Sequence, residues 1–158
     1  MYVSKEFIEE NAGFRPAAYI FIFKGPNLIV GKKKGEDYYS LPGGKLETGE
    51  TPEDGALRET LEEVGIAVTK LKSLGYPTII RFDTLSWGNY IGSINHFFRA
   101  EFDRIEETSL GQGPEGALER IEISPSDYIK HLDRRINDTE YYGQKVFFQT
   151  QKDLLKKL

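Results

Sequence analysis

The stretch Gly44–Ile66 constrains the fold of this chain more than any other, because it sets glycines and acidic residues at fixed spacings. It reads G-KLETG-E-TPEDGAL-RE-T-L-EE-V-G-I. Thr51 suits a helix N-cap, the next residue is a proline suited to the first helical position, and Asp54 completes a variant capping box. Gly65 suits the left-handed position that ends a helix. We therefore predict a helix over about Pro52–Val64, preceded by a loop.

Three glutamates share one face of this predicted helix. With 3.6 residues per turn, Glu59, Glu62 and Glu63 stand at i, i+3 and i+4. The opposite face is taken mostly by Leu57, Thr60, Leu61 and Val64. We therefore expect that face to pack on a core and the acidic face to point outward. Neighbouring like charges repel, and a hard cation with oxygen ligands, Mg²⁺ or Mn²⁺, would offset the repulsion. The alternative is an acidic face that water alone solvates.

The spacing of the whole stretch resembles the Nudix box, in which a glycine, a glutamate, an Arg-Glu pair, a Glu-Glu pair and a second glycine follow at set intervals. The matching residues are Gly44, Glu50, Arg58, Glu59, Glu62, Glu63, Gly65 and Ile66. Thr60 departs from the pattern, which usually has an apolar residue there. The resemblance implies an α/β (α+β) fold, the Nudix α/β/α sandwich with a mixed β-sheet between helices. It also implies a metal-dependent hydrolase that cleaves the diphosphate linkage of a nucleoside diphosphate derivative.

The run just upstream, Tyr38–Gly44 (YYSLPGG), resembles the aromatic-x-x-Pro-Gly-Gly run that leads into the Nudix loop. Its glycines let the backbone come close to a metal or a phosphate, because no Cβ stands in the way. By resemblance, the carbonyl of Gly43 is a candidate metal ligand. Arg58, again by resemblance, would hold Glu50 and steady the loop against the helix.

The family pattern assigns roles to the acidic residues. Diphosphate cleavage needs in-line attack by water and neutralisation of the developing charge, and divalent cations serve both needs. By resemblance, Glu59, Glu62 and Glu63 bind the metal, although Glu59 could instead be the general base. With Arg58 and Glu50 they form the predicted catalytic set.

Family members often recruit one more glutamate from outside the box. The candidates here are Glu101, Glu115 and Glu119. We favour Glu115 as the additional metal ligand because it follows a glycine-rich loop, and loops often carry function. Glu101 ends a predicted strand and reads better as a solvated edge residue.

Composition limits the cellular setting and the partners. At 158 residues and 18.0 kDa the chain is expected to form a single domain over residues 1–158. It has no cysteine, and no run approaches the roughly 20 apolar residues of a membrane span or forms a signal peptide. We therefore expect a cytoplasmic protein with no membrane partner. The net charge of −4 argues against a long nucleic acid as a partner. It is compatible with a small nucleotide substrate, because a metal could carry the positive charge.

Strands and helices are predicted to alternate along the chain. The predicted strands are Ala17–Lys24, Asn27–Lys32, Ala67–Tyr76, Thr78–Asp83, Ile94–Phe102 and Arg120–Ile123, with a hairpin at Gly25-Pro26 between the first two. Besides the box helix, we predict a short helix over Tyr128–Leu132 and a long amphipathic helix within Thr139–Leu158.

Substrate contacts are predicted from aromatic and basic residues outside the box. Arg15 and Arg81 are candidates to bind phosphate, whereas the run Lys32–Lys34 reads better as solvated surface. Trp87 is the leading candidate to stack on a base, and it shares its segment with Phe82 and Tyr90. The alternative is that these rings pad the sheet or a dimer contact. We expect His96 to be a packed core or edge residue and His131 to be a surface residue of a helix, neither of them catalytic.

Several readings of function remain open on the sequence. The first is a pyrophosphohydrolase acting on a nucleoside triphosphate or on a nucleotide sugar such as ADP-ribose. A non-catalytic nucleotide sensor is the alternative, although such domains usually have damaged boxes and this box keeps its acidic residues and its arginine. An enzyme acting on RNA 5′ ends is a third reading, which the acidic charge disfavours. The number of metals and the oligomeric state stay open, with a homodimer among the alternatives.

Overall fold

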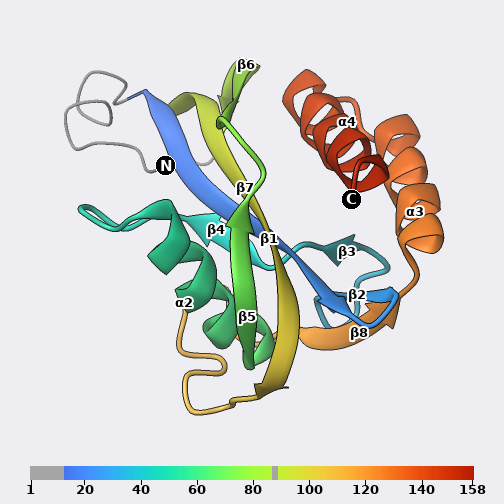
Figure 1. Ribbon diagram of the computed structural model, residues 1–158. Helices are drawn as coiled ribbons and strands as arrows, with labels where there is room; N and C mark the ends of the chain where they lie inside the picture. The colour runs from blue at the N-terminus through green and yellow to red at the C-terminus, as the bar shows by residue number, and fades with distance from the viewer. Residues whose placement is uncertain (1–12, 87–88) are drawn as a thin grey trace.

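The computed structural model describes residues 13–86 and 89–158, which form a mixed β-sheet with helices on both faces (Figure 1). The helix α2 covers one face, and α3 and α4 lie on the other (Figure 1). In chain order the elements are β1 (Phe14–Lys24), β2 (Asn27–Lys32), β3 (Tyr39–Ser40), β4 (Gly43–Lys45), α2 (Pro52–Val64), β5 (Ile66–Ser73), β6 (Thr78–Ser86), β7 (Tyr90–Ile105), β8 (Glu119–Ile123), α3 (Pro125–Asp138) and α4 (Tyr142–Lys156).

The sheet is built around one parallel pair of long strands. The main order is β3-β2-β1-β7-β5, while β4 pairs with β1, β6 with β7 and β8 with β2. β1 and β7 run parallel, and the other pairs are antiparallel. Together with the helices on the two faces, this mixed sheet confirms the predicted α/β/α sandwich.

The apolar run of β1 is continuous because both faces of this central strand are buried. Tyr19 and Phe21 pack in the cluster that contains residues of α3 and α4. Ile20 and Ile22 point the other way, into the cluster that contains Ala56 and Val64 of α2. Because side chains alternate along a strand, β1 contributes to the cores on both sides of the sheet.

The box helix has the predicted bounds and caps. Thr51 is the N-cap, and its hydroxyl accepts a hydrogen bond from the Asp54 N–H at 3.1 Å. Gly65 is left-handed, with φ of 63°, and its N–H donates to the Leu61 carbonyl. Thr60 occupies the family's apolar position without an unpaired hydroxyl, because its buried Oγ1 donates to the Ala56 carbonyl at 2.7 Å. A hydroxyl paired in this way can face the core at little cost.

Several predicted boundaries differ from the structure; β1, β6 and β7, for example, are longer than predicted. β5 ends at Ser73 rather than at Tyr76, because the chain turns there and the Gly75 N–H donates to the Ser73 hydroxyl. α3 runs on to Asp138, well beyond the predicted end at Leu132, whereas α4 lies within the predicted range Thr139–Leu158. None of the helices in the described part of the chain has both the length and the apolar character needed to cross a bilayer.

The prediction that His131 lies on the surface is wrong. Its side chain is 5% exposed and lies among aromatic rings, with the ring centres of Tyr39 and Tyr128 at 4.9 and 5.8 Å. The prediction of a packed His96 is confirmed, since this residue is 3% exposed in β7. Among the described residues its Nε2 has no hydrogen-bond partner.

Replacing His96 by leucine is expected to improve stability at acid pH relative to the wild type. Burial lowers the pKa of His96 to about 4, from 6.5, since the interior disfavours the imidazolium. Between pH 6.5 and 4 the His96 imidazole is therefore protonated in the unfolded chain and neutral in the folded chain. The free energy of unfolding of the wild type falls as the pH drops through this range. Urea unfolding at pH 7.5 and at pH 4.5 gives the free energy of unfolding of both proteins. The value for His96→Leu relative to the wild type should be higher at pH 4.5 than at pH 7.5 by about 2–3 kcal/mol. An unchanged difference would contradict this account.

Candidate active site

The box residues border a cavity of about 590 Å³, here called the carboxylate cavity. Its wall is formed by β1, β4 and the loop after it, α2 and the loop 111–116. The predicted residues Arg15, Gly43, Arg58, Glu59 and Glu115 all line it. The fold thus gathers residues from positions 15 to 115 at one place.

The two glycines of β4 let the backbone lie directly on the helix carboxylates. Gly43 has φ of 150°, and a Cβ there would lie 2.2 Å from the Ala18 carbonyl oxygen. A Cβ on Gly44 would lie 3.0 Å from Oε1 of Glu59. The Gly43 N–H donates to Oε1 of Glu63 at 3.0 Å. Any side chain at either position would separate the strand from the acidic residues.

This packing corrects the expectation that the acidic face points outward. Glu59 and Glu63 are only 8% and 6% exposed, whereas Leu57 and Leu61 are half-buried. α2 packs on β1, β4 and β5, and the glycine backbone of β4 offers polar N–H groups to a carboxylate instead of an apolar surface. Of the acidic face, Glu59 lines the carboxylate cavity, whereas Glu62 and Glu63 are not among its lining residues.

Arg58 is the centre of an ion-pair network. Its Nε and Nη2 donate to the two carboxylate oxygens of Glu50 at 2.7 and 2.9 Å. Its Nη1 donates to Glu59 and Glu62, both at 3.1 Å. The hydrogen bonds from Arg58 hold the pKa of Glu50 below its ordinary value, and the same pairing raises the pKa of Arg58. The contact between Arg58 and Glu50 that the resemblance implies is therefore present.

The remaining negative charge is poorly compensated. Burial raises the pKa of Glu63 well above its ordinary value; the Gly43 N–H opposes this shift, while the Glu59 and Glu115 carboxylates add to it. Burial likewise raises the pKa of Glu59 despite Arg58. In residues 13–86 and 89–158 no group of three or more histidine, cysteine, aspartate or glutamate side chains is arranged so that it could hold a metal ion as it stands. Arg58 and the Gly43 N–H occupy oxygens of Glu59, Glu62 and Glu63.

The donor set nevertheless fits a hard divalent cation. Buried carboxylates that repel one another are the oxygen ligands that Mg²⁺ and Mn²⁺ prefer. A side chain at Gly44 would come against the Glu59 carboxylate, so the glycine leaves space beside that ligand. Glu59, Glu62, Glu63 and Glu115 are the residues that would hold the ion.

The loop that carries Glu115 is anchored to the end of α2. The Gly111 N–H donates to the Glu62 carbonyl at 2.7 Å, and the Leu118 N–H donates to the Glu63 carbonyl at 2.7 Å. Glu115 therefore lines the cavity through direct attachment of its loop to the box helix. The other two candidates lie elsewhere in ion pairs: Glu101 contacts Lys70 at 3.1 Å, and Glu119 contacts Lys32 at 3.6 Å.

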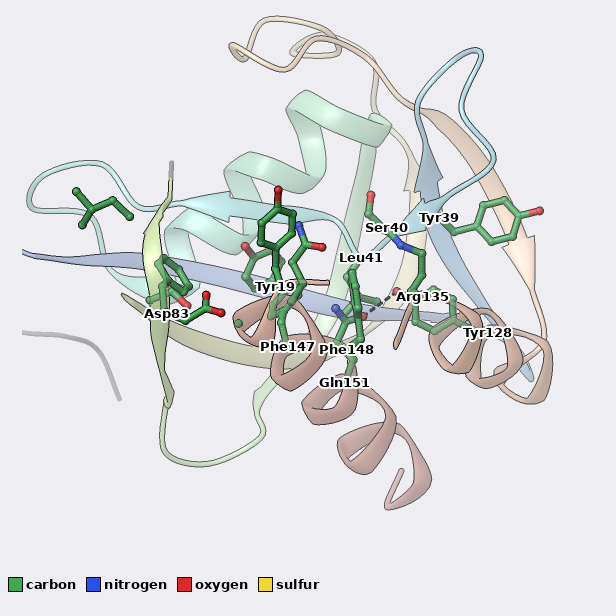
Figure 2. A pocket seen from close by; sticks show the side chains of 16 residues that line it. Tyr19, Tyr39, Ser40, Leu41, Asp83, Tyr128, Arg135, Phe147, Phe148 and Gln151 are labelled. Atoms are coloured by element: carbon green, nitrogen blue, oxygen red, sulfur yellow. Dashed lines mark hydrogen bonds between the residues drawn. The ribbon is translucent and has the colours of Figure 1, made fainter. Parts of the chain in front are cut away.

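A second cavity, of about 570 Å³, lies between α3, α4 and the sheet (Figure 2). We call it the aromatic cavity, since its wall includes Tyr19, Tyr39, Phe82, Tyr128, Tyr141, Phe147 and Phe148. Tyr19 lines both cavities. Its hydroxyl accepts a hydrogen bond from Nη1 of Arg15 at 3.2 Å. The two cavities are therefore neighbours on either side of one side chain.

The residues predicted to bind the substrate lie in different parts of the structure. Arg15 lines the carboxylate cavity and Phe82 the aromatic cavity. Arg81 lies over the Phe14 ring at 5.8 Å and lines neither of these cavities. Trp87 lies outside the described residues, so its predicted stacking role stays a prediction. The ring of Tyr90 lies under Nζ of Lys45, a residue of the carboxylate cavity.

Several residues of the aromatic cavity were missed by the sequence analysis. They include Tyr39, Tyr128, Arg135, Phe147 and Gln151. One signal was available for Gln151, because this amide interrupts the apolar stripe of α4. Arg135 gave no such signal, because it looks like a solvated residue near a helix end.

Comparison with known proteins agrees with the geometry. The Wolbachia pipientis wMel RNA pyrophosphohydrolase is 31% identical over 103 residues, which cover 60% of this chain and 64% of that protein. The protein of the same name from Wolbachia pipientis subsp. Culex pipiens (strain wPip) is 43% identical over 60 residues, 37% of each chain. The chain thus spans less than two thirds of the length of these curated relatives.

Solved structures share the fold. A NUDIX hydrolase from Nitrosomonas europaea aligns with a TM-score of 0.56 at 17% identity, covering 76% of this chain and 78% of that one. The MutT protein of Bacillus halodurans gives 0.55 at 23% identity, covering 74% and 72%. The NUDIX domain profile matches residues 13–142, which is most of the chain and includes both cavities' strands. The chain therefore belongs to the NUDIX domain family.

Proposed function

We propose that this protein is a divalent-metal-dependent pyrophosphohydrolase that cleaves the diphosphate linkage of a nucleoside diphosphate derivative. One observation carries the proposal: Glu59, Arg58, Glu115 and Arg15 line one cavity that adjoins an aromatic cavity through Tyr19. Substrate classes that fit are nucleoside triphosphates and nucleotide sugars such as ADP-ribose. The family membership supports the reaction type.

The charges of the carboxylate cavity suit a diphosphate only when a cation is present. Glutamates alone would repel the anion, and a bound Mg²⁺ or Mn²⁺ supplies both charge neutralisation and a water of lowered pKa. Glu59, Glu62, Glu63 and Glu115 would hold the ion, with Gly43 offering its carbonyl as a further ligand. Arg15, on the β1 side of the cavity, is positioned for a phosphoryl oxygen.

Hydrolysis of the diphosphate needs an attacking water, a base and a positioned loop. Water attacks one phosphorus atom, its bond to the bridging oxygen breaks, and the bridging oxygen leaves with the other phosphate. A carboxylate takes the proton of the attacking water, and Glu59, which lines the cavity, is the candidate for this role if it does not bind the ion. Arg58 keeps Glu50 and the loop in place and so acts as a positioning residue.

The aromatic cavity is proposed to hold the nucleoside. Phe82, Phe147 and Tyr19 offer ring faces on which a base can stack. The adjoining position of this cavity would let the base lie there while the diphosphate lies against the glutamates. Arg81 lines neither cavity, and its predicted role in substrate binding stays a prediction.

A second candidate is removal of pyrophosphate from RNA 5′ ends. The observation that favours it is the name of the Wolbachia relatives, both RNA pyrophosphohydrolases. The net charge of −4 weighs against extended contact with a polyanion. A cytoplasmic location and a homodimer remain predictions on either reading.

A substrate panel tests the proposal. We expect phosphate or pyrophosphate release from at least one of the nucleoside triphosphates, ADP-ribose, NADH, sugar nucleotides and a 5′-triphosphorylated oligoribonucleotide. Activity should require Mg²⁺ or Mn²⁺ and vanish with EDTA, because the carboxylates cannot neutralise the transition state alone. Turnover of the oligonucleotide alone would select the second candidate. Ligand binding without turnover of any compound would contradict an enzyme and indicate a sensor.

A further inference from the structure

Arg135 of α3 presents a positive charge in the wall of the aromatic cavity, away from the glutamates. Its guanidinium carbon lies 3.9 Å from the ring centre of Tyr38 and 4.6 Å from that of Phe148. These rings come from the segment before β3 and from α4, so the guanidinium is held between two separate elements. A planar group fixed in this way loses little further freedom on binding a ligand.

The guanidinium of Arg135 has no acidic partner in the part of the chain that the structure describes. Neither a hydrogen bond nor an ion pair joins its side chain to a carboxylate there. Burial lowers its pKa, with only partial compensation from neighbours such as Tyr38 and Glu36. Arg81 and Arg99 also lie over rings, but they line neither cavity. Arg135 therefore differs from these two arginines in lining a cavity.

A donor of fixed orientation lies in the same cavity. The Tyr128 hydroxyl donates to Oε1 of the buried Gln151 at 2.8 Å, the contact drawn in Figure 2. The carboxamide oxygen of Gln151 is the acceptor in this bond, so the phenol proton of Tyr128 points at Gln151. Within the described part of the chain no hydrogen bond is found for the NH₂ group of Gln151, so it can donate to a ligand. Rings, an amide donor and a guanidinium together suit a planar base that carries an anionic group.

We propose that Arg135 binds a second phosphate of the substrate, one carried by the nucleoside part beyond the scissile diphosphate. This proposal rests on the proposed function. The Phe147 ring lies 4.9 Å from that of Tyr19 and 6.0 Å from that of Phe148, over which Arg135 lies. A nucleoside stacked on these phenylalanines would therefore lie between Tyr19, which borders the carboxylate cavity, and Arg135. Arginine binds phosphate through two parallel N–H bonds, which a stacked, unpaired guanidinium can offer. The phosphate is either a terminal phosphomonoester or the next phosphodiester of an RNA end.

Substrate pairs that differ by this phosphate test the proposal. The pairs are NADPH and NADH, coenzyme A and its 3′-dephospho form, and a 5′-triphosphorylated dinucleotide and the matching nucleoside triphosphate. We expect the wild type to favour the phosphate-bearing member of at least one pair by about 10- to 100-fold in kcat/KM, mainly through KM. The first two pairs report a phosphomonoester and the third reports a phosphodiester.

The variants are Arg135→Met, Arg135→Lys and, as the matched control, Arg134→Met. Arg135→Met should abolish the preference, and Arg135→Lys should restore only part of it, because lysine lacks the bidentate geometry. The neighbouring Arg134, which contacts the Asp37 carbonyl and His131, should leave it unchanged. A preference that survives Arg135→Met, or its absence from all three pairs in the wild type, overturns the proposal.

Binding measured in EDTA separates this proposal from the proposed function. Titration calorimetry with adenosine 3′,5′-bisphosphate and with AMP needs no turnover. Tighter binding of the bisphosphate to the wild type than to Arg135→Met supports the phosphate site even if no compound is hydrolysed. Equal binding of the bisphosphate to both proteins refutes the site even if hydrolysis is found.

Discussion

Glu63→Gln is expected to lower kcat on the order of a thousandfold with Mg²⁺, while making the metal-free protein more stable than the wild type. Glu63 is 6% exposed, accepts the Gly43 N–H and lies beside Glu59. Glutamine has the shape of the protonated acid, so it keeps the hydrogen bond from Gly43 and removes one negative charge. The variant should therefore fold well and bind the cation poorly.

The gain in stability follows from the direction of the Glu63 pKa shift. Burial raises the pKa of Glu63 above 4.5 in the folded, metal-free protein. Its contribution to stability is therefore present below pH 4.5 and is lost as the pH rises through the folded value. Glutamine does not titrate and escapes this loss. At pH 7.5 in EDTA, urea unfolding should show the variant more stable by roughly 1–3 kcal/mol.

Metal linkage provides the second readout for this variant. Mn²⁺ should raise the thermal midpoint of the wild type, because a ligand that binds only the folded state stabilises it. The rise should be much smaller for Glu63→Gln. Glu101→Gln is the matched control, since Glu101 pairs with Lys70 away from the cavity. The assignment of Glu63 as a metal ligand is contradicted if Glu63→Gln keeps a tenth of wild-type turnover. It is also contradicted if Mn²⁺ raises the thermal midpoint of the variant as much as that of the wild type.

Arg58→Met is expected to destabilise the protein by about 3 kcal/mol and to reduce activity by about 10- to 100-fold. The side chain of Glu50 is 12% exposed and receives two of its hydrogen bonds from Arg58. Methionine fills much of the space of the arginine stem but leaves this carboxylate buried and unpaired. Glu59 and Glu62 also lose a counter-charge, so the loop and the acidic face should both loosen.

A double-mutant cycle with Glu50→Gln isolates the pair. The loss in Arg58→Met/Glu50→Gln should be smaller than the sum of the single losses by about 1–3 kcal/mol in urea unfolding. Because Arg58 lowers the pKa of Glu50, the pair stabilises the protein above pH 4.5, and this contribution is lost as the pH falls through the folded value. The cost of Arg58→Met should shrink accordingly below pH 4.

Arg120→Met is the control for the Arg58 cycle. Arg120 also reaches α2, through the Val64 carbonyl at 3.0 Å, and pairs with Glu107. Its side chain is 35% exposed and that of Glu107 is 53% exposed, so water screens the pair and its loss should cost under about 1 kcal/mol. The prediction is contradicted if Arg58→Met and Arg120→Met lower the free energy of unfolding equally and if the effects of Arg58→Met and Glu50→Gln are additive. The Arg58 network would then contribute no more to stability than a solvent-exposed ion pair.

Local signals were read well from the sequence. The caps of α2 and the hairpin at Gly25-Pro26 agree with the structure, since each depends on residues close together in the chain. The box spacing also predicted the partners Arg58 and Glu50, which are eight residues apart on a loop and a helix. Boundaries that depend on distant contacts, such as the ends of β7 and the end of α3, were predicted less well.

Burial was the main error of the sequence analysis. Helical spacing predicts which residues share a face, but it does not predict which other element packs against that face. Glu59 and Glu63 were predicted to point outward, and they are buried because β4 presents a glycine backbone that can donate to carboxylates. His131 was assigned to the surface, and it is buried because rings from β3 and α3 surround it.

By itself, therefore, the sequence determined the loop and capped helix of Gly44–Ile66, the acidic face and the sandwich fold. Only the tertiary structure decided that Arg15 and Glu115, a hundred residues apart, line one cavity with Glu59. It also placed Arg135 against Tyr38 and Phe148 in a second cavity. The physical reason is that caps and spacings act within a few residues, whereas a cavity forms where strands and helices far apart in the chain pack together.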